Sequence, residues 1–454
     1  MGNAHSRTSV IRRVGVALLF MVAFALPPLL VGGVGVARAL QAEQAKPTPL
    51  STALPAVKPH DPTKPTAVVV AGNNGTESSD VLGPYEELAT STKYNVYVAA
   101  PEQRPAPLFP GSVSLLPHYS FADYDATFDG KVDLLVVPYI PNTDTTDAPV
   151  LTWIQHKANA GTTILSICAG AQMVADAGVL GGQTATSHHN TLPVVKGSHP
   201  EVNWLNGVRY VDSGQFISSA GITSGVDATL YTLSREFGRD VADQTAAAMG
   251  YPHLRFIDDP TWIVPTPSLL PMLPNAYRWD PTQIGLVLFD GVREVEVGSV
   301  IDTYPHSLAA DVRPIALAPG LVHTQHGLDL VVQDDLASAP RLDRVLVPGT
   351  PSAAVTSTVD QWAGARGLAA ERIHAAGEYA YDATLRDMAR HETNPIVQEA
   401  ATGIEYPQRD LHLNGPEVRL EIVLRPLALG LLGLSGLLLL RSRQTPAFAR
   451  RPAT

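Results

Sequence analysis

The chain has 454 residues, 45% of them hydrophobic, and this length favours two or three domains over one. Its formal net charge is -11, from 43 acidic and 32 basic residues. This balance excludes a general nucleic-acid-binding surface, because phosphate binding needs a concentrated basic face. Cys168 is the only cysteine, so the chain can form no intramolecular disulfide.

An apolar segment opens the chain. Arg12 and Arg13 precede an uncharged stretch over residues 14–36, which is long enough to span a bilayer because about 20 apolar residues suffice. A cleaved signal peptide is the alternative, since the Ala-Arg-Ala sequence at 37–39 fits the small-x-small cleavage rule. Residues 1–40 therefore predict a membrane anchor or a signal segment, and in both cases the following chain is exported.

The next part of the chain has the pattern of an α/β domain. Residues 41–65 are rich in Pro and Ala and predict an extended tether. Over 66–256, short apolar strands alternate with helices, which predicts a parallel sheet covered on both faces. We expect strands at 67–71, 94–99, 132–138, 162–168 and 215–219, and helices at 81–89, near 153–154, from 170, at 227–236 and at 240–249.

Cys168 stands where an apolar strand ends and small residues open a helix, which is the pattern of a nucleophile elbow. A helix N-terminus favours negative charge, so this position predicts a lowered thiol pKa. Ligands of such sheets bind at the carboxyl ends of the strands, where Cys168 falls. The alternative is an inert buried cysteine, because free Cys is often fully buried.

Acidic side chains and backbone amides are candidates to surround the thiol. Asp80, at the start of a helix after the first strand, could carry a proton for Cys168 or merely cap its helix. Glu86, in the same helix, is a second candidate, or a solvated helix residue. The N–H groups of Ala169, Gly170 and the loop around Tyr139 could form an oxyanion hole.

Two adjacent histidines follow the elbow helix. His188 and His189 could supply a base, or could form a metal site together with His199. The spacing shows no further ligand pattern around them. We therefore expect an exposed polar turn with His188 as a candidate base, and neither a metal nor a cofactor.

A Pro-rich stretch over 257–282 predicts a linker, and residues 283–410 then repeat pieces of the first domain. The offset between matching residues falls from 209, at Trp153 and Trp362, to 155, at Asp227 and Asp382. The 54 missing residues are expected to include the elbow strand and the cysteine. This pattern predicts a tandem duplication whose second copy has no reactive centre.

A second apolar segment lies near the end of the chain. Residues 426–440 carry no charge and are followed by arginines, which predicts a transmembrane segment over 422–440 and a basic tail over 441–454. A buried core helix is the alternative. Basic residues outside both apolar segments place both termini in the cytoplasm by the positive-inside rule. The middle of the chain would then lie outside the cell membrane.

Several motifs, taken in chain order, resemble the ThiJ/PfpI family of the class I glutamine amidotransferase-like superfamily. They are Asp80-x-x-Gly83-Pro84-x-Glu86, Asp133 to Pro138, Ile167-Cys168-Ala169-Gly170-Ala171, Ala177-Gly178-Val179-Leu180-x-Gly182, Ala185-Thr186-Ser187-His188 and Ser219 to Asp227. They are most similar to the branch shared by isocyanide hydratases and the sensor domains of AraC-type regulators.

The resemblance implies a flavodoxin-like sandwich in which Cys168 is the nucleophile and Asp80 its carboxylate partner. It also implies a small-molecule substrate or ligand, and family members often pair as homodimers. We expect the ligand to lie near five residues, which are Gly83, Glu86, Tyr139, Ala169 and Gly170.

The flanks of Cys168 depart from the family pattern. Ala169 stands where proteolytic members carry His and hydratase-like members tend to carry Thr, and Pro138-Tyr139-Ile140 replaces the usual Pro-Gly-Gly. Two functions therefore remain open. One is a membrane-anchored, outward-facing, cysteine-dependent hydrolase or hydratase that acts on a small molecule. The other is a non-catalytic binding or sensing domain of the same fold.

Overall fold

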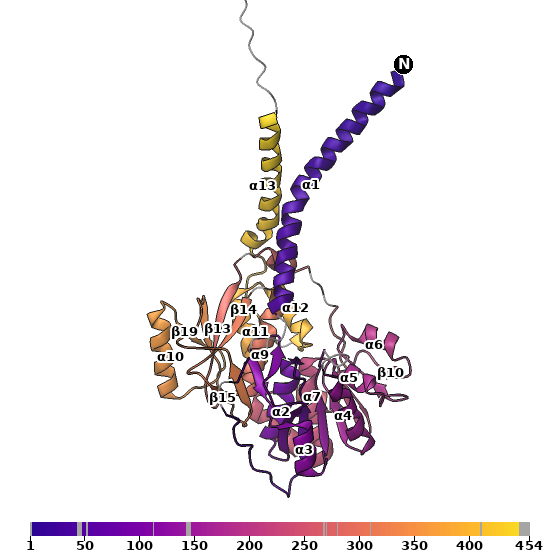
Figure 1. The fold of residues 1–454 in the computed structure, drawn as a ribbon, viewed down its shortest axis with the longest axis vertical. Helices are drawn as coiled ribbons and strands as arrows, with labels where there is room; N and C mark the ends of the chain where they lie inside the picture. The colour runs from indigo at the N-terminus through magenta and orange to yellow at the C-terminus, as the bar shows by residue number, and fades with distance from the viewer. Residues whose placement is uncertain are drawn as a thin grey trace, which may run out of the picture.

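The computed structural model describes residues 2–42, 48–50, 53–111, 113–141, 147–266, 268, 270–278, 280–308, 310–408 and 411–444. Two long helices, α1 (Gly2–Ala42) and α13 (Leu420–Gln444), extend from the same side of an α/β body (Figure 1). The predicted tail beyond Gln444 and parts of the predicted tether, residues 43–47 and 51–52, lie outside the described residues.

The first half is built on a seven-stranded sheet, which confirms the expected parallel α/β architecture. All neighbouring strands run parallel except the pair β11 and β12. The order across the sheet is β11 (Tyr210–Ser213), β12 (Phe216–Ser219), β8 (Thr163–Ser166), β7 (Leu134–Val137), β1 (Thr66–Val70), β3 (Asn95–Ala100) and β6 (Tyr119–Ser120).

Helices cover both faces of this sheet, which explains why its central strands are continuously apolar. Val69 packs in the core under one helical layer, and Val68 packs under the other. The first layer consists of α2 (Ser78–Thr90), α7 (Ile222–Phe237) and α8 (Arg239–Met249). The second consists of α3 (Phe121–Phe128), α4 (Ala148–Asn159), α5 (Gly170–Asp176) and α6 (Leu192–Ser198), with the small pair β9 (Thr184–Ala185) and β10 (Asn203–Trp204) beside them.

The second half contains a five-stranded parallel sheet. Its order is β17 (Asp334–Asp335), β14 (Ala310–Ala316), β13 (Thr282–Leu288), β18 (Arg344–Val347) and β19 (Ala370–Arg372). Its helices are α9 (Glu294–Thr303), α10 (Ala353–Ala365), α11 (Ala380–His391) and α12 (Asn394–Gly403). If the strands of this sheet are numbered by their order in the chain, the order across the sheet is third, second, first, fourth, fifth. The strands β6-β3-β1-β7-β8 of the first half have the same order.

Strand β19 takes the place that β8 has in the first sheet. Val347 pairs with Arg372 as Val137 pairs with Ser166. The expectation that the second half has no elbow strand is therefore wrong, because that strand is present and paired. Two residues beyond Arg372 stands His374, at the position that corresponds to Cys168.

The two halves share a third sheet, of order β15 (Leu321–His323), β16 (Asp329–Val332), β5 (Val113–Leu116), β4 (Ala106–Phe109) and β2 (Thr76–Glu77). Within it, β16 of the second half pairs antiparallel with β5 of the first. Helices α2 and α9 also pack together, and a side chain at Gly298 would lie 3.5 Å from Leu82 Cδ1. The connecting segment holds the short 3-10 helices η1 (Leu254–Ile257) and η2 (Leu273–Tyr277), and a third, η3 (Pro305–Ser307), follows α9. One hydrophobic core thus runs through both halves.

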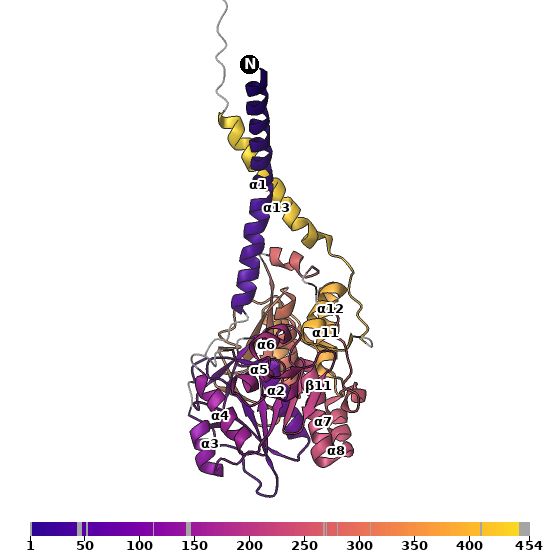
Figure 2. The same cartoon turned by 90° about the vertical axis from the view of Figure 1, so that its right-hand side faces the viewer.

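The terminal helices pack side by side, as Figures 1 and 2 both show. Glycines allow the close approach, because a Cβ at Gly433 would lie 2.0 Å from the carbonyl oxygen of Ala23, and one at Gly430 would lie 2.6 Å from the Phe24 ring. Residues 13–38 and 424–443 are long and apolar enough to cross a membrane, by length and composition.

Candidate functional site

Cys168 lies in a sharp turn between β8 and α5. Its φ of +56° is in the left-handed region, which a residue with a side chain seldom adopts. Its own N–H donates to Ser219 Oγ at 3.1 Å. Behind it, a Cβ on Gly170 would lie 2.0 Å from the carbonyl oxygen of Val137, so this position has no room for a side chain. The strand-turn-helix geometry of an elbow is therefore present at the thiol.

Two buried carboxyl groups stand at the start of α2, on the elbow side of the sheet. Glu77 is the N-cap residue, and its Oε2 accepts the N–H of Asp80 at 2.5 Å. Asp80 is fully buried, and its Oδ2 accepts the N–H of Tyr139 at 3.0 Å. Asp80 is therefore not the cap. Our sequence reasoning missed Glu77 because Ser, Thr, Asp and Asn are the usual N-cap residues.

The expected lowering of the Cys168 pKa is wrong. Burial raises the pKa of the thiol well above its ordinary value, and the charges of Asp80, Glu77 and Glu405 raise it further. The hydrogen bond from the Ala169 N–H acts in the opposite direction but is outweighed. Burial also raises the pKa of Asp80 well above its ordinary value. The thiol of Cys168 is therefore neutral near neutral pH, and burial favours the protonated form of the nearby Asp80 carboxyl group.

Two of the three expected oxyanion donors are already engaged within the protein. The Tyr139 N–H donates to Asp80, and the Gly170 N–H donates to the carbonyl oxygen of Ile167 at 2.7 Å. The Ala169 N–H is the one that faces the sulfur of Cys168. A developing negative charge beside the thiol would thus meet one backbone donor and the proton of Asp80.

The second half contributes Glu405 to this region. Glu405 is fully buried, and its Oε1 accepts the His189 N–H at 3.1 Å and lies 2.8 Å from His189 Nδ1. Gly221 makes room for it, because a Cβ there would lie 2.5 Å from the Glu405 side chain. Burial raises the pKa of Glu405, but the hydrogen bond from His189 and the charges of both histidines hold it below its ordinary value.

His188 faces the second half. Its Nε2 lies 2.9 Å from the carbonyl oxygen of Gly403 and 4.0 Å from Glu405 Oε1. The contact with the elbow is made by the preceding residue, Ser187, whose Oγ donates to the Cys168 carbonyl oxygen at 3.3 Å. His199 is elsewhere, 2.8 Å from Asp176 and 3.2 Å from Glu201, so it does not join the other two histidines.

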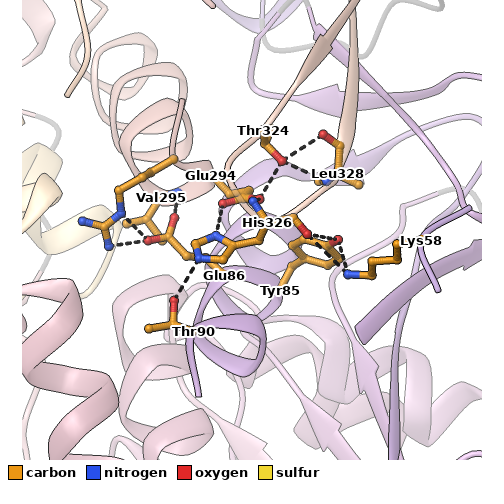
Figure 3. Close-up of polar contacts among 10 residues, drawn as sticks. Lys58, Tyr85, Glu86, Thr90, Glu294, Val295, Thr324, His326 and Leu328 are labelled. Atoms are coloured by element: carbon orange, nitrogen blue, oxygen red, sulfur yellow. Dashed lines mark hydrogen bonds and ion pairs between the residues drawn. The ribbon is translucent and has the colours of Figure 1, made fainter. Parts of the chain in front are cut away.

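Glu86 is held at the interface between the halves (Figure 3). Its Oε1 accepts from the Arg293 guanidinium, and its Oε2 accepts the Val295 N–H at 2.7 Å. Glu86 is fully buried, so the solvated-helix alternative is wrong. The carboxylate that we expected near the ligand instead binds the start of α9. Gly83 lies within α2, where a side chain would come 3.9 Å from Glu87 Oε1.

A second group of polar contacts lies beside Glu86 at the same interface (Figure 3). Glu294 accepts from Thr324 Oγ1 at 2.6 Å and lies 2.8 Å from His326 Nδ1. Lys58, from the predicted tether, donates to the hydroxyl of Tyr85 at 2.9 Å. The described end of the tether is therefore packed against both halves.

In the second half, an imidazole stands at the position that corresponds to the thiol of Cys168. His374 is buried, with Nε2 3.1 Å from Thr384 Oγ1, and burial lowers its pKa to about 3. Glu296 stands where the first half has Asp80, and a Cβ on Gly349 would lie 2.3 Å from its carboxylate. Burial raises the pKa of Glu296 to about 7. This region has an acid but no sulfur nucleophile.

Comparison with known proteins places these features in a family. The model of the DJ-1/PfpI family, another name for the ThiJ/PfpI family, matches residues 66–234. An isonitrile hydratase of Pseudomonas putida is 29% identical over 178 residues, which cover 38% of this chain and 72% of the hydratase. A deglycase of Pyrococcus horikoshii is 29% identical over 171 residues, covering 36% of this chain and 92% of the deglycase.

Regulators and solved structures are also similar to this chain. The HTH-type transcriptional regulator GbdR of Pseudomonas aeruginosa is 28% identical over 105 residues, and the match spans 23% of this chain and 28% of the regulator. The crystal structure of Drosophila melanogaster DJ-1beta aligns at 21% identity with a TM-score of 0.36, covering 40% of this chain and 96% of that one. Residues 66–234 of the chain, with Cys168 at their elbow, are a DJ-1/PfpI family domain.

Proposed function

We propose that this chain is a membrane-anchored, outward-facing enzyme in which Cys168 acts on a small electrophilic molecule, as a hydratase or hydrolase. The observation that carries the proposal is the left-handed backbone of Cys168, with a φ of +56° at the strand-helix junction. A strained backbone of this kind persists only where the surrounding structure fixes it, and such residues gather at active sites. The buried acid Asp80 supplies the proton that a neutral thiol mechanism needs.

The proposed reaction begins with the neutral thiol. For an isonitrile, the sulfur of Cys168 forms a bond to the terminal carbon, Asp80 protonates the same carbon to give a thioimidate, and the thiol proton restores Asp80. Water then attacks the same carbon and the carbon–sulfur bond breaks, which returns the thiol. For an isonitrile, the net addition of one water gives an N-substituted formamide. The similarity to an isonitrile hydratase over 72% of that enzyme supports this substrate class.

The purified full chain in detergent, given an aliphatic isonitrile, tests the proposal by the rate of formamide production. We expect Cys168→Ser to abolish turnover and Asp80→Asn to lower kcat by roughly 100-fold or more, the usual contribution of a general acid. The matched control is Glu296→Gln, which changes the corresponding acid of the second half and should leave turnover intact. Formamide production by Cys168→Ser at the normal rate would rule out the nucleophile.

A binding or sensing role is the second candidate, and the state of the thiol favours it. Cys168 is only 6% exposed, and its pKa is raised by burial and by the surrounding acids. Because Cys168 is the only cysteine, iodoacetamide labelling reports on it alone. If the role is sensing, the native chain should alkylate more slowly at pH 7 to 8 than the urea-unfolded chain. A native rate equal to or above the unfolded rate would contradict this candidate.

Duplication of one scaffold is part of the proposal. The shared strand order, the pairing of β19 beside β18 and the acid at Glu296 all support a second copy that kept its frame and lost its thiol. Beyond His374 the chain reaches α11 after residues 375–379 alone. The offset between the copies is 206 at His374 and 155 at Asp382, so the shortening of the second copy falls after His374.

The proposed location is the cell membrane, with the body outside and both termini in the cytoplasm. The apolar length of residues 13–38 and 424–443 and the packing of α1 on α13 support two anchors. A reporter fused after Thr454 should be active only if it folds in the cytoplasm, and an outward-facing reporter would contradict the two-anchor arrangement. Homodimer formation stays a prediction, which the mass of the detergent-solubilised protein would test.

A further inference from the structure

We propose that His188, His189 and Glu405 form a binding site for one divalent transition-metal ion, of which zinc is the type, and that the second half completes the site by supplying Glu405. The proposal uses neither Cys168 nor its chemistry, and so it stands apart from the proposed catalytic function. Two imidazoles and one carboxylate are the protein ligands of many catalytic zinc sites, in which a fourth position stays open.

The three ligand atoms already lie together. His188 Nε2, His189 Nδ1 and Glu405 Oε1 are all within 4.8 Å of one another. His189 Nδ1 is 2.8 Å from Glu405 Oε1, and His188 Nε2 is 4.0 Å from it. Tetrahedral zinc with bonds of about 2.0 to 2.1 Å keeps its ligand atoms roughly 3.3 Å apart. The observed separations fall on either side of that value, so small side-chain movements would admit an ion.

The charge and surroundings of Glu405 suit a cation. Glu405 is a fully buried carboxylate with two imidazoles as its neighbours. The φ of Glu405 is +54°, and its carbonyl oxygen accepts from Arg209 at 3.0 Å and from Thr223 Oγ1 at 2.7 Å. A strained backbone held by several bonds is typical of ligand clamps.

In two other groups of histidine and carboxylate side chains, an arginine already pairs with a carboxylate. In the group of Glu86, Glu294 and His326, the guanidinium of Arg293 neutralises Glu86. In the group of Glu371, Asp387 and His391, Arg344 lies 3.0 Å from Asp387 and 2.6 Å from Glu371. The hydrogen bonds to the Glu405 carboxylate come from His189 and Ser224. Glu405 therefore keeps negative charge available for an ion.

Metal titration of the full chain in detergent tests the proposal. After treatment with a chelator, the protein is titrated with Co²⁺, whose visible absorption reports a tetrahedral site, and zinc content is measured by mass spectrometry after Zn²⁺ loading. We expect one ion per chain, roughly 100-fold or greater weakening in Glu405→Gln and in His188→Ala, and unchanged binding in His199→Gln. His199 is a matched control because it also pairs with carboxylates.

Each outcome decides the proposal. Failure of the wild-type chain to take up one ion, or equally tight binding by Glu405→Gln and His188→Ala, would overturn it. Circular dichroism shows whether Glu405→Gln folds. If this variant does not fold, the metal affinity of His188→Ala decides the proposal. Cys168→Ser should keep the full metal content, so failure of the thiol chemistry and failure of metal binding are distinguishable.

Discussion

Three buried carboxyl groups raise the pKa of Cys168, while one short helix that begins beside it acts to lower this pKa. Helix α5 has seven residues, so its N-terminus offers little positive potential against Asp80, Glu77 and Glu405. Burial also raises the pKa of Cys168, because it disfavours the thiolate. Burial raises the pKa values of Cys168, Asp80 and Glu77, which favours their protonated forms, whereas the neighbouring histidines hold the pKa of Glu405 below its ordinary value. The protonated forms favour substrates whose reaction begins with protonation.

Gly170 is a residue whose size the elbow requires. A Cβ there would lie 2.0 Å from the Val137 carbonyl oxygen, so Gly170→Ala must push the elbow away from β7. We expect a loss of about 1 to 3 kcal/mol in unfolding free energy, as for other overpacked sites. Urea denaturation of wild type and variant measures it. Gly197→Ala is the control, because nothing lies within 4 Å of a Cβ there. Equal midpoints for all three proteins would contradict the crowding.

Glu296 should give the fold a pH dependence. Its pKa is about 7 in the folded chain, against an ordinary value of 4.5, so the folded state binds this proton more tightly than the unfolded state. The stabilisation is complete below about pH 4.5 and is lost as pH rises towards 7. Glu296→Gln keeps a neutral side chain at every pH. We expect the variant to match wild type near pH 4.5 and to exceed it by roughly 2 to 3 kcal/mol at pH 8.

Urea unfolding at a series of pH values measures this difference. The control is Glu201→Gln, whose side chain is 52% exposed and should behave like wild type throughout. A constant difference between Glu296→Gln and wild type from pH 4.5 to 8 would show that the carboxyl group does not titrate in this window.

At the scale of elements, α2 and the start of α9 connect the two halves through a buried carboxylate and its hydrogen-bond donors. Glu86 of α2 binds the N–H at the start of α9 and the Arg293 guanidinium, so a buried charge is satisfied across the interface. A carboxylate at a helix N-terminus is favoured by the helix dipole. The contacts of Glu86 with Arg293 and with the Val295 N–H therefore restrict the relative position of α2 and α9.

Arg293→Ala should destabilise the chain strongly, because it leaves Glu86 buried without its cationic partner. We expect a loss of roughly 3 kcal/mol or more, the usual cost of breaking a buried ion pair. Adding Glu86→Gln should restore part of it, since a neutral amide can stay buried. Thermal unfolding compares the variants. Arg104→Ala, in an exposed pair with Glu102, should cost less than about 1 kcal/mol. A similar small effect of Arg293→Ala would contradict the assigned role.

At the scale of the whole molecule, we expect the two halves to fold as one unit. Strands β16 and β5 come from different halves and pair within one sheet, and the hydrophobic core crosses between them. Neither half on its own can satisfy the backbone groups of this shared sheet. The halves therefore differ from independent domains joined by a linker.

Expressed alone, residues 53–265 and 283–408 should each fold poorly, because each exposes an unpaired strand edge and part of the core. Coexpressed, they should elute together on size exclusion, and hydrogen exchange should show protected amides at 113–116. A monomeric first half with the same protection at 113–116 would contradict the single folding unit.

Much of the first half could be predicted from the sequence, because local patterns determine it. The apolar runs predicted the central strands, and the small residues after Cys168 predicted the turn and the helix. The partners of Glu86 and His189 could not be predicted in this way. Arg293 and Glu405 lie 207 and 216 residues away from them, and no local pattern indicates contacts at such separations.

The sequence by itself determined the α/β class, the elbow at Cys168 and the two apolar ends, since each follows from neighbouring residues. Only the tertiary structure decided the direction of the thiol pKa, the burial of Glu86 and the place of His374 just beyond strand β19. The physical reason is shared by all three. Burial and long-range charge depend on which distant segments pack together, and packing is a property of the whole fold.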